Sequence, residues 1–210
     1  IFRSDHRIYR VSMVLACLLG GLSAGAQAAI GPNQFVDVTQ QAIPDYLDTG
    51  EKYVGESYSA SWGDANGDGW LDLFVSHHRN TPSIYINMGD MTFEDRWFEV
   101  ESWRILPELD QHGAAWSDFD NDGDQDLFVS LGATDPSQFL VHDGQVLVDR
   151  TGPSNCGTNC DPENYNFDTT GWSGRLPVWF DYTQDGYLDL ILANRGGNAP
   201  LFAQLPGEPP

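Results

Sequence analysis

Residues Asp118 to Asp126, with the sequence Asp-Phe-Asp-Asn-Asp-Gly-Asp-Gln-Asp, carry the clearest signal of the fold. Gly123 stands at position 6 of this loop, where the backbone must double back with a positive φ angle that a Cβ atom would strain. Carboxylates brought this close repel one another unless a cation lies among them, and oxygen-only ligands on a tight turn suit calcium best of the common ions. The residues that follow, 127–130, predict a buried strand. The carboxylates at positions 1, 3, 5 and 9 are Asp118, Asp120, Asp122 and Asp126.

The same loop occurs twice more in the chain. The first copy precedes the apolar run Leu73–Val75, and the third precedes Leu190–Leu192. One acidic loop could arise by chance, but three loops in one register indicate a repeat. The residues at positions 1, 3, 5, 6 and 9 are Asp64, Asn66, Asp68, Gly69 and Asp72 in the first copy, and Asp181, Thr183, Asp185, Gly186 and Asp189 in the third.

The spacing around the loops predicts the architecture. A tryptophan stands two residues before each loop, and a tyrosine or phenylalanine follows each tryptophan by 23 residues. The distance between loops varies instead, from 54 to 63 residues. A fixed interior with variable connectors is typical of propeller blades, so we predict an all-β fold of four-stranded antiparallel β-propeller blades, with about three blades present as a partial propeller. The aromatic residues are Trp62, Trp116 and Trp179, followed by Tyr85, Phe139 and Phe202.

The chain therefore divides into a leader, an N-terminal connection and three units. The tryptophans in fixed register are expected in the core between blades. The predicted parts are 1–28 (signal peptide), 29–57 (a strand at 35–39 and a connection), 58–110 (blade 1), 111–173 (blade 2 with a cysteine-containing insertion) and 174–210 (incomplete blade 3). The strands predicted within the units are 59–62, 71–76, 84–86 and one from 92; then 113–116, 127–130, 139–141 and 146–148; then 178–180, 188–193 and 201–203.

The first 28 residues predict export. Arginines precede an apolar run over residues 11–22, and small residues ending in Ala26-Gln27-Ala28 follow it. This is the pattern of a secretory signal peptide cleaved after Ala28, and the run is short for a membrane span. We expect a secreted or cell-envelope protein without a membrane span in the mature chain. Cys156 and Cys160 would then form a local disulfide, which is better supported than zinc because no second Cys or His pair lies near them.

The strongly negative net charge of the chain excludes some classes of binding partner. The chain has 210 residues and a formal net charge of −21, and ten of its carboxylates stand at the loop positions named above. Such a balance argues against nucleic acid or an anionic membrane surface as a partner. The hydrophobic share of 40% is ordinary for a folded protein, so the acidity does not indicate disorder.

The motif Trp-x-Asp-x-Asp-x-Asp-Gly-x-x-Asp-Leu, followed by an aromatic strand and a Gly-Asp turn, resembles the FG-GAP/VCBS repeat. This repeat forms the blades of integrin α-subunit propellers and occurs in many secreted bacterial proteins. The phrase at 35–39 resembles the blade ending of cartilage acidic protein and of the ASPIC/UnbV group. The resemblance covers about residues 33–205. It implies Ca²⁺ bound by side chains at positions 1, 3, 5 and 9 and by the backbone carbonyl at position 7, which here belongs to Trp70, Asp124 and Tyr187.

Two departures from this family change the expectation. Thr183 replaces the usual Asp or Asn at position 3, so the third calcium site should be the weakest. Propellers of this family close with six or seven blades, whereas this chain holds three. Either the chain is the N-terminal part of a longer protein, or it assembles with further blades from other chains.

Other readings of the acidic loops fit less well. An EF-hand or dockerin needs an acid at position 12 and a following helix, but position 12 is occupied by Val75, Val129 and Leu192 within β-type runs. Glycosidase carboxylates face each other across a cleft and occur once, whereas these acids are consecutive and recur. Metal ligation is therefore the better interpretation.

A few residues outside the repeat could carry chemistry. His77-His78-Arg79 and His112 are candidates for a transition-metal or catalytic site, although turn and strand-edge roles are expected instead. Trp97, Trp103 and Trp172 are candidates for ligand contact or for packing under loops. No nucleophile motif such as Gly-x-Ser-x-Gly is present.

The sequence thus predicts an exported, calcium-binding structural or adhesion-type module that is not an enzyme. Its propeller loops would bind a protein or glycan. The alternative is a propeller scaffold at the N-terminus of a larger secreted polysaccharide hydrolase or lyase, whose catalytic part lies beyond residue 210.

Overall fold

The computed structural model describes residues 35–44, 56–96, 109–132, 136–151, 169 and 173–204. The chain divides into two compact units, Ile1–Asp37 and Val38–Pro210, and every helix and strand named below belongs to the second. The predicted signal peptide, Cys156 and Cys160, and the three tryptophans outside the repeat lie outside the described residues.

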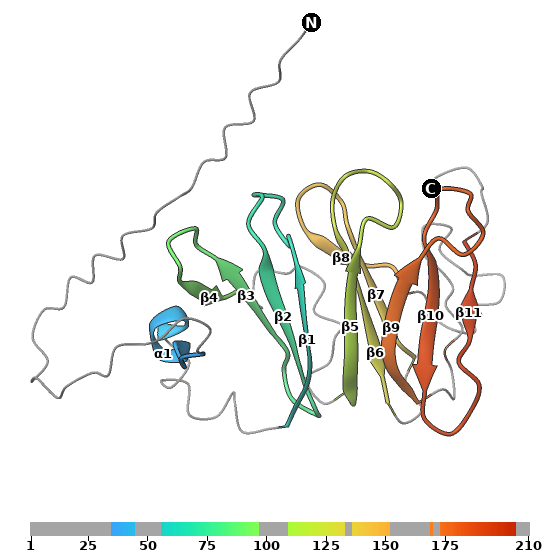
Figure 1. Ribbon diagram of the computed structural model, residues 1–210, viewed down its shortest axis with the longest axis horizontal. Coiled ribbons are helices and arrows are strands. Elements are labelled where there is room, and N and C mark those ends of the chain that lie inside the picture. Colours follow the sequence, from blue (N-terminus) through green and yellow to red (C-terminus); the bar gives the residue numbers. More distant parts are fainter. Residues whose placement is uncertain are drawn as a thin grey trace, which may run out of the picture. The chain divides into compact units, whose positions relative to one another are not determined.

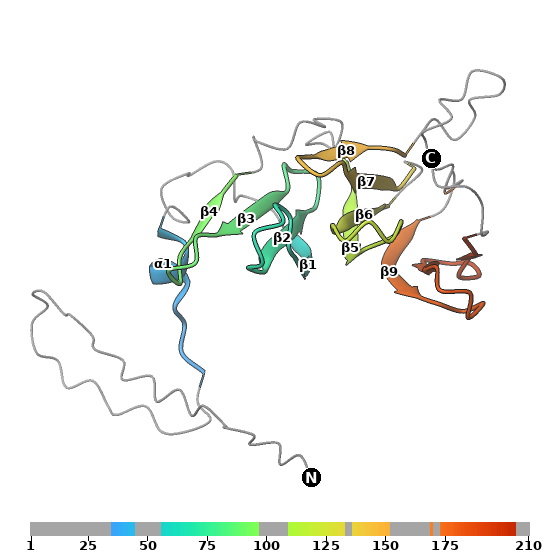
Figure 2. The ribbon, with the colours of Figure 1, turned by 90° about the horizontal axis from the view of Figure 1, so that it is seen from above.

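The strands form three antiparallel sheets in which neighbours in sequence are neighbours in space (Figures 1 and 2). The prediction of antiparallel blades is confirmed: two sheets have four strands and the third has three among the described residues. The residue boundaries predicted above for the leader, the connection and the three blades stay predictions. The first sheet holds β1 (Ser57–Gly63), β2 (Asp72–His77), β3 (Ser83–Asn87) and β4 (Phe93–Asp95); the second β5 (Gln111–Ser117), β6 (Asp126–Leu131), β7 (Gln138–His142) and β8 (Leu147–Asp149); the third β9 (Gly174–Phe180), β10 (Asp189–Asn194) and β11 (Leu201–Phe202).

Each acidic loop is the hairpin turn between the first two strands of its sheet. The strands flanking the loops pair in the same register three times, with the last aspartate of the loop opening the second strand. The sequence repeat is therefore a structural repeat, and the three loops lie at equivalent places. The pairs that close the loops are Gly63 with Asp72, Ser117 with Asp126, and Phe180 with Asp189.

The hydrophobic core lies between adjacent sheets. One buried cluster joins Phe74 and Ile84 of the first sheet to four leucines and one valine of the second, and another joins Phe128 and Phe139 of the second sheet to Leu190 and Leu192 of the third. Period-two alternation along the strands places these side chains on the inner faces. The second sheet is consequently the most buried of the three, since it is covered on both sides.

The tryptophans in fixed register face the preceding sheet. Trp116 packs against the first cluster and donates a hydrogen bond of 3.2 Å from Nε1 to the carbonyl of Ser61, and Trp179 packs against the second cluster. The expected core position is confirmed for these two. Trp62 is 54% exposed, because no sheet precedes β1 in the part of the chain that the structure describes.

The strand predicted at 35–39 is wrong. Residues 35–38 have no regular structure, and the short helix α1 (Thr39–Ala42) follows, held by hydrogen bonds from the N–H groups of Ala42 and Ile43 to the carbonyls of Val38 and Thr39. A strand needs a partner to pair its backbone groups, and no described strand lies against this segment. The backbone bonds locally instead.

Gly113 of β5 allows the second and third sheets to approach closely. A Cβ atom there would lie 1.9 Å from the carbonyl oxygen of Arg175 and 2.8 Å from Cδ of Pro177. Because the first obstacle is backbone, we expect Gly113→Ala to lower the free energy of unfolding by about 3 kcal/mol in a urea titration. Gly197→Ala is the control, since its new methyl would meet only the end of the Asn194 side chain, at 3.3 Å. Equal effects of the two substitutions would contradict this packing.

Candidate metal centre

The loop backbone takes the same shape in all three copies. The φ angle is positive at position 6, at Gly69 (86°), Gly123 (98°) and Gly186 (92°), as the sequence predicted. It is also positive at position 4, at Gly67 (71°), Asn121 (61°) and Gln184 (60°), which the sequence analysis did not predict. Gly and Asn tolerate this left-handed conformation best. Two such residues in one short loop turn the side chains at positions 1, 3 and 5 inward.

The last aspartate of each loop is a buried clamp. Asp126 is 1% exposed, and its two oxygens each accept a backbone hydrogen bond of 2.9 Å, one from Phe119 at the start of the loop and one from His142 at the end of β7. The carboxylate therefore joins the loop to the third strand of its sheet. The other copies repeat this with bonds from Ala65 and Asn87 to Asp72, both 2.8 Å, and from Tyr182 (2.7 Å) and Gln204 (2.9 Å) to Asp189.

The first aspartate is already hydrogen-bonded in the first and third loops. Asp64 accepts from the N–H groups of Asp68 (3.1 Å) and Gly69 (2.8 Å). Asp181 accepts in the same way from Asp185 (3.2 Å) and Gly186 (3.0 Å). Backbone donors thus offset part of the negative charge in these two loops.

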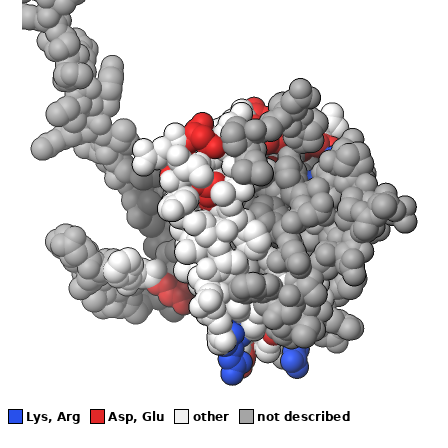
Figure 3. All heavy atoms as spheres, turned by 90° about the vertical axis from the view of Figure 1, so that its right-hand side faces the viewer, with Lys and Arg blue, Asp and Glu red and all other residues white. Residues whose placement is uncertain are grey.

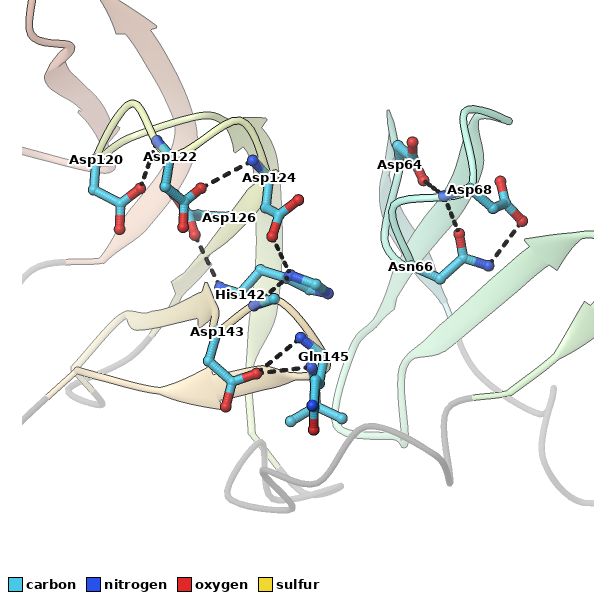
Figure 4. A network of polar contacts seen from close by, with 12 residues as sticks. Asp64, Asn66, Asp68, Asp120, Asp122, Asp124, Asp126, His142, Asp143 and Gln145 are labelled. Carbon is cyan, nitrogen blue, oxygen red and sulfur yellow. Dashed lines mark hydrogen bonds and ion pairs between the residues drawn. The ribbon is translucent and has the colours of Figure 1, made fainter.

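The second loop differs, because among the described residues Asp118 accepts no such bond, and its carboxylate converges with those of Asp120 and Asp122. Oxygens of Asp118, Asp120 and Asp122 lie within 4.8 Å of one another. Oδ1 of Asp118 is buried and has no hydrogen-bond partner among the described residues. Asp120 accepts a bond of 3.3 Å from the N–H of Asp122, and Asp122 one of 2.9 Å from Asp124 (Figure 4). A buried carboxylate oxygen without a donor, facing two further carboxylates, fits a hard cation.

The residue at position 7 is held by the acid at position 5 in every copy. The backbone N–H groups of Trp70, Asp124 and Tyr187 donate bonds of 2.8, 2.9 and 3.0 Å to Asp68, Asp122 and Asp185. The role of the position 7 carbonyls as ligands stays a prediction, as do the roles of Asn66 and Thr183. The backbone bond at position 7 is nonetheless the same in all three loops.

Burial disfavours the ionised forms of Asp120 and Asp126 in the second loop. Burial raises the pKa of Asp126 to about 7, against the two backbone N–H groups that lower it. Burial and the charge of Asp122 raise the pKa of Asp120, and burial raises the pKa of Asp72 in the first loop. A bound cation reverses this preference because it favours the charged form.

His142 is a neighbour of the second loop that the sequence analysis missed. It is buried at the end of β7, and its Nδ1 lies 3.1 Å from Oδ2 of Asp124 and accepts a bond of 3.2 Å from the N–H of Gly144 (Figure 4). The side chain of Asp124 is thus turned toward His142 and does not belong to the converging group of Asp118, Asp120 and Asp122. The signal in the sequence was weak, because only one of the three units carries a histidine at this place.

The histidines considered earlier fall into two groups. His77 belongs to β2 rather than to a turn, and its ring nitrogens lie 3.0 Å from the hydroxyl of Ser57 and 3.4 Å from that of Ser83. His78 and His112, expected in turn and strand-edge roles, come together with Asp110. Burial lowers the pKa of His112, although Asp110 beside it acts in the opposite direction.

Comparison with known proteins adds one finding. Residues 64–129 match the family model described as FG-GAP-like repeat. The match begins at the first residue of the first loop and ends within β6, so it covers both of the first two acidic loops. No curated protein matches the sequence.

Proposed function

This chain carries an FG-GAP-like repeat, and from that premise we propose that it is an exported binding module whose blades are stabilised by calcium. The family match and the three sheets support a propeller-like structural or binding repeat. Calcium binding, export and an adhesion-type role go beyond these two observations.

The arrangement in the second loop carries the calcium proposal. Three carboxylates converge there, and one buried oxygen of Asp118 has no hydrogen-bond donor in the described part of the chain. Calcium accepts six to eight oxygen ligands in flexible geometry, so the loop has the chemistry for it. The ligands would be the side chains of Asp118, Asp120, Asp122 and Asp126, with the carbonyl of Asp124.

The protein's own groups prepare this loop before any ion binds. Asp126 fixes the ends of the loop through two backbone bonds, and Asn121 and Gly123 supply the left-handed turns. A calcium ion supplies charge compensation, which removes the repulsion among the ionised carboxylates. We expect weaker binding at the first and third loops, since Asp64 and Asp181 already accept backbone bonds and Thr183 adds no charge.

Asp122→Ala tests the assignment at the second loop. The substitution removes one of the four proposed carboxylate ligands, and calcium affinity depends on the number of charged ligands. We expect the calcium affinity of one site to fall by about tenfold or more, measured by isothermal titration calorimetry on the full chain. The other two sites should be unchanged.

Asp143→Ala is the matched control for this measurement. Asp143 is an exposed aspartate of the same sheet, and it too accepts backbone bonds, both 3.0 Å, from Gln145 and Val146. It stands outside the acidic loop. Unchanged calcium binding in Asp122→Ala, or an equal loss in Asp143→Ala, would refute the ligand assignment.

Two uncovered sheet faces support a binding or assembly role. On β9, the side chains of Leu176, Val178 and Phe180 are exposed on the face away from the second sheet, and Trp62 is exposed on β1. Figure 3 views the β9–β11 side, where most acidic atoms in view lie toward the top and the most prominent basic atoms lie at the bottom. Further blades would cover such apolar faces, while a protein or glycan partner would bind the loops. The enzyme-scaffold alternative stays a prediction.

The proposal of export depends on the predicted signal peptide at residues 1–28. Among the described residues, no helix is long and apolar enough to span a membrane. Calcium sites of extracellular modules have dissociation constants of about 10⁻⁴–10⁻³ M. Such sites are filled only in calcium-rich surroundings, which an extracytoplasmic location would provide.

A further inference from the structure

A second cluster of metal-ligating side chains lies far from the acidic loops. It consists of His78, Asp110 and His112, which we call the histidine cluster. β2 runs from the first loop to His77, and β5 runs from Gln111 to the second loop, so the cluster lies at the opposite end of both strands. It is therefore independent of the calcium loops in position.

The backbone brings the histidine cluster together from two sheets. His78 follows β2 and pairs with Asp110 through an isolated antiparallel bridge. The N–H of Gly132, after β6, donates a bond of 2.6 Å to the carbonyl of Asp110, and the N–H of Arg79 donates one of 3.1 Å to Leu109. These bonds fix the three side chains at the junction of the first and second sheets.

The potential ligand atoms converge on one place. One oxygen, Oδ1 of Asp110, contacts Nε2 of His78 and lies 3.0 Å from Nε2 of His112. The three atoms lie within 4.8 Å of one another, and the two imidazole rings stand 5.7 Å apart, inclined at 47°. Two imidazole nitrogens and a carboxylate oxygen thus lie close together.

This arrangement leaves buried polar atoms unsatisfied. His112 is only 7% exposed, and Nε2 makes no well-aligned hydrogen bond to Asp110 despite the short distance. Oδ1 of Asp110 and Nδ1 of His112 also have no hydrogen-bond partner among the described residues. Buried groups of this kind cost free energy unless they are satisfied. A metal ion bound between them would coordinate Nε2 of His78, Nε2 of His112 and Oδ1 of Asp110 together.

The surroundings are also those of a metal site. Tyr58 stands edge-on to both imidazoles, with ring centroids 4.9 and 4.8 Å away. Oε2 of Glu56 accepts a hydrogen bond of 2.8 Å from the Tyr58 hydroxyl and lies 3.9 Å from Nδ1 of His78, so a carboxylate stands near the ring nitrogen that is not directed at Asp110. A Cβ atom at Gly132 would lie 2.2 Å from Asp110 and 2.5 Å from Nε2 of His112, so the two side chains pack directly against the backbone of this glycine.

We propose that the histidine cluster binds a divalent first-row transition-metal ion, with zinc as the best fit, and so joins the first two sheets. Two imidazoles and one carboxylate are the ligand set that zinc takes in sites with an open fourth position, whereas calcium avoids nitrogen ligands. Binding needs a lone pair on each Nε2, so each ring carries its proton on Nδ1, which in His78 faces Glu56.

The test is a titration of the full chain with Zn²⁺ alone in excess calcium, which keeps the acidic loops filled. We expect one zinc per chain, and affinity reduced at least about tenfold in His78→Gln and in His112→Gln. X-ray absorption should place nitrogen and oxygen neighbours at about 2.0–2.1 Å. His78 is partly exposed, and thermal melts of both variants check that the fold is kept.

His142→Gln is the matched control, since His142 is also buried and faces a carboxylate, Asp124, without a second histidine. It should leave the zinc affinity unchanged, as should Asp122→Ala. Absence of zinc binding to the unmodified chain, or binding kept in folded His78→Gln and His112→Gln, would overturn the proposal. Because calcium is measured at other residues, failure here leaves the calcium proposal standing.

Discussion

In excess EDTA we expect the full chain to melt roughly 10–30 °C lower than in about 10 mM calcium. At sites with dissociation constants of about 10⁻⁴–10⁻³ M, this calcium concentration stabilises the folded state by about 1.4–2.7 kcal/mol per site. Three sites would contribute about 4–8 kcal/mol, and each kcal/mol shifts the melting temperature of a chain of this size by about 2–4 °C. The measurement is a thermal melt followed by circular dichroism.

Magnesium is the control for this experiment. It demands near-octahedral geometry and gives up its water reluctantly, so it should raise the melting temperature much less than calcium. A melting temperature equal in EDTA and in calcium would contradict the proposed mechanism while leaving the fold intact. Asp122→Ala should keep a calcium response from the first and third loops, and so indicate how the total is divided.

The second large effect is expected for Asp126→Ala, which should lower the free energy of unfolding by about 4 kcal/mol even in EDTA. The substitution leaves the buried N–H groups of Phe119 and His142 without their acceptors. Each such loss costs about 1–3 kcal/mol. Measurement by urea denaturation in EDTA isolates the hydrogen bonds from any metal, because no calcium is present to lose its ligand.

Two variants sharpen this measurement. Asp126→Asn keeps one acceptor oxygen. It also removes a carboxylate that burial disfavours in its charged form, raising the pKa of Asp126 to about 7. The free energy of unfolding should therefore fall less than in Asp126→Ala. Asp143→Ala removes an exposed acid with two backbone bonds, whose donors can bond to water, and should cost less than about 1 kcal/mol. Equal losses for Asp126→Ala and Asp143→Ala would show that the buried clamp contributes little.

The repeat was predictable because its signals are local. A glycine at position 6 is required by the φ angle of the loop itself, and an apolar run after the loop forms a strand in any sheet that covers it. The strand at 35–39 was wrongly predicted for the converse reason. Its residues favour a strand, but pairing needs a partner, and the described chain offers none.

The roles of buried polar residues were less accessible from the sequence. Asp72, Asp126 and Asp189 were predicted as ligands from their spacing, yet each also accepts a bond from a backbone N–H 15 or 16 positions further along the chain, in or just after the third strand of its sheet. The distinction between the second loop and the others also depended on which backbone N–H groups reach the first aspartate. Spacing does not reveal such contacts.

The repeating blade, the place of its acidic loops and the residue types that suit calcium could be predicted from the sequence, since these depend on neighbours along the chain. The groups that meet across sheets could be identified only once the strands were placed in space. His78 and His112 are separated by 34 positions, and they converge on Asp110 because the first two sheets pack side by side. Contacts of this kind arise from packing between sheets, and packing is settled only when the whole chain has folded.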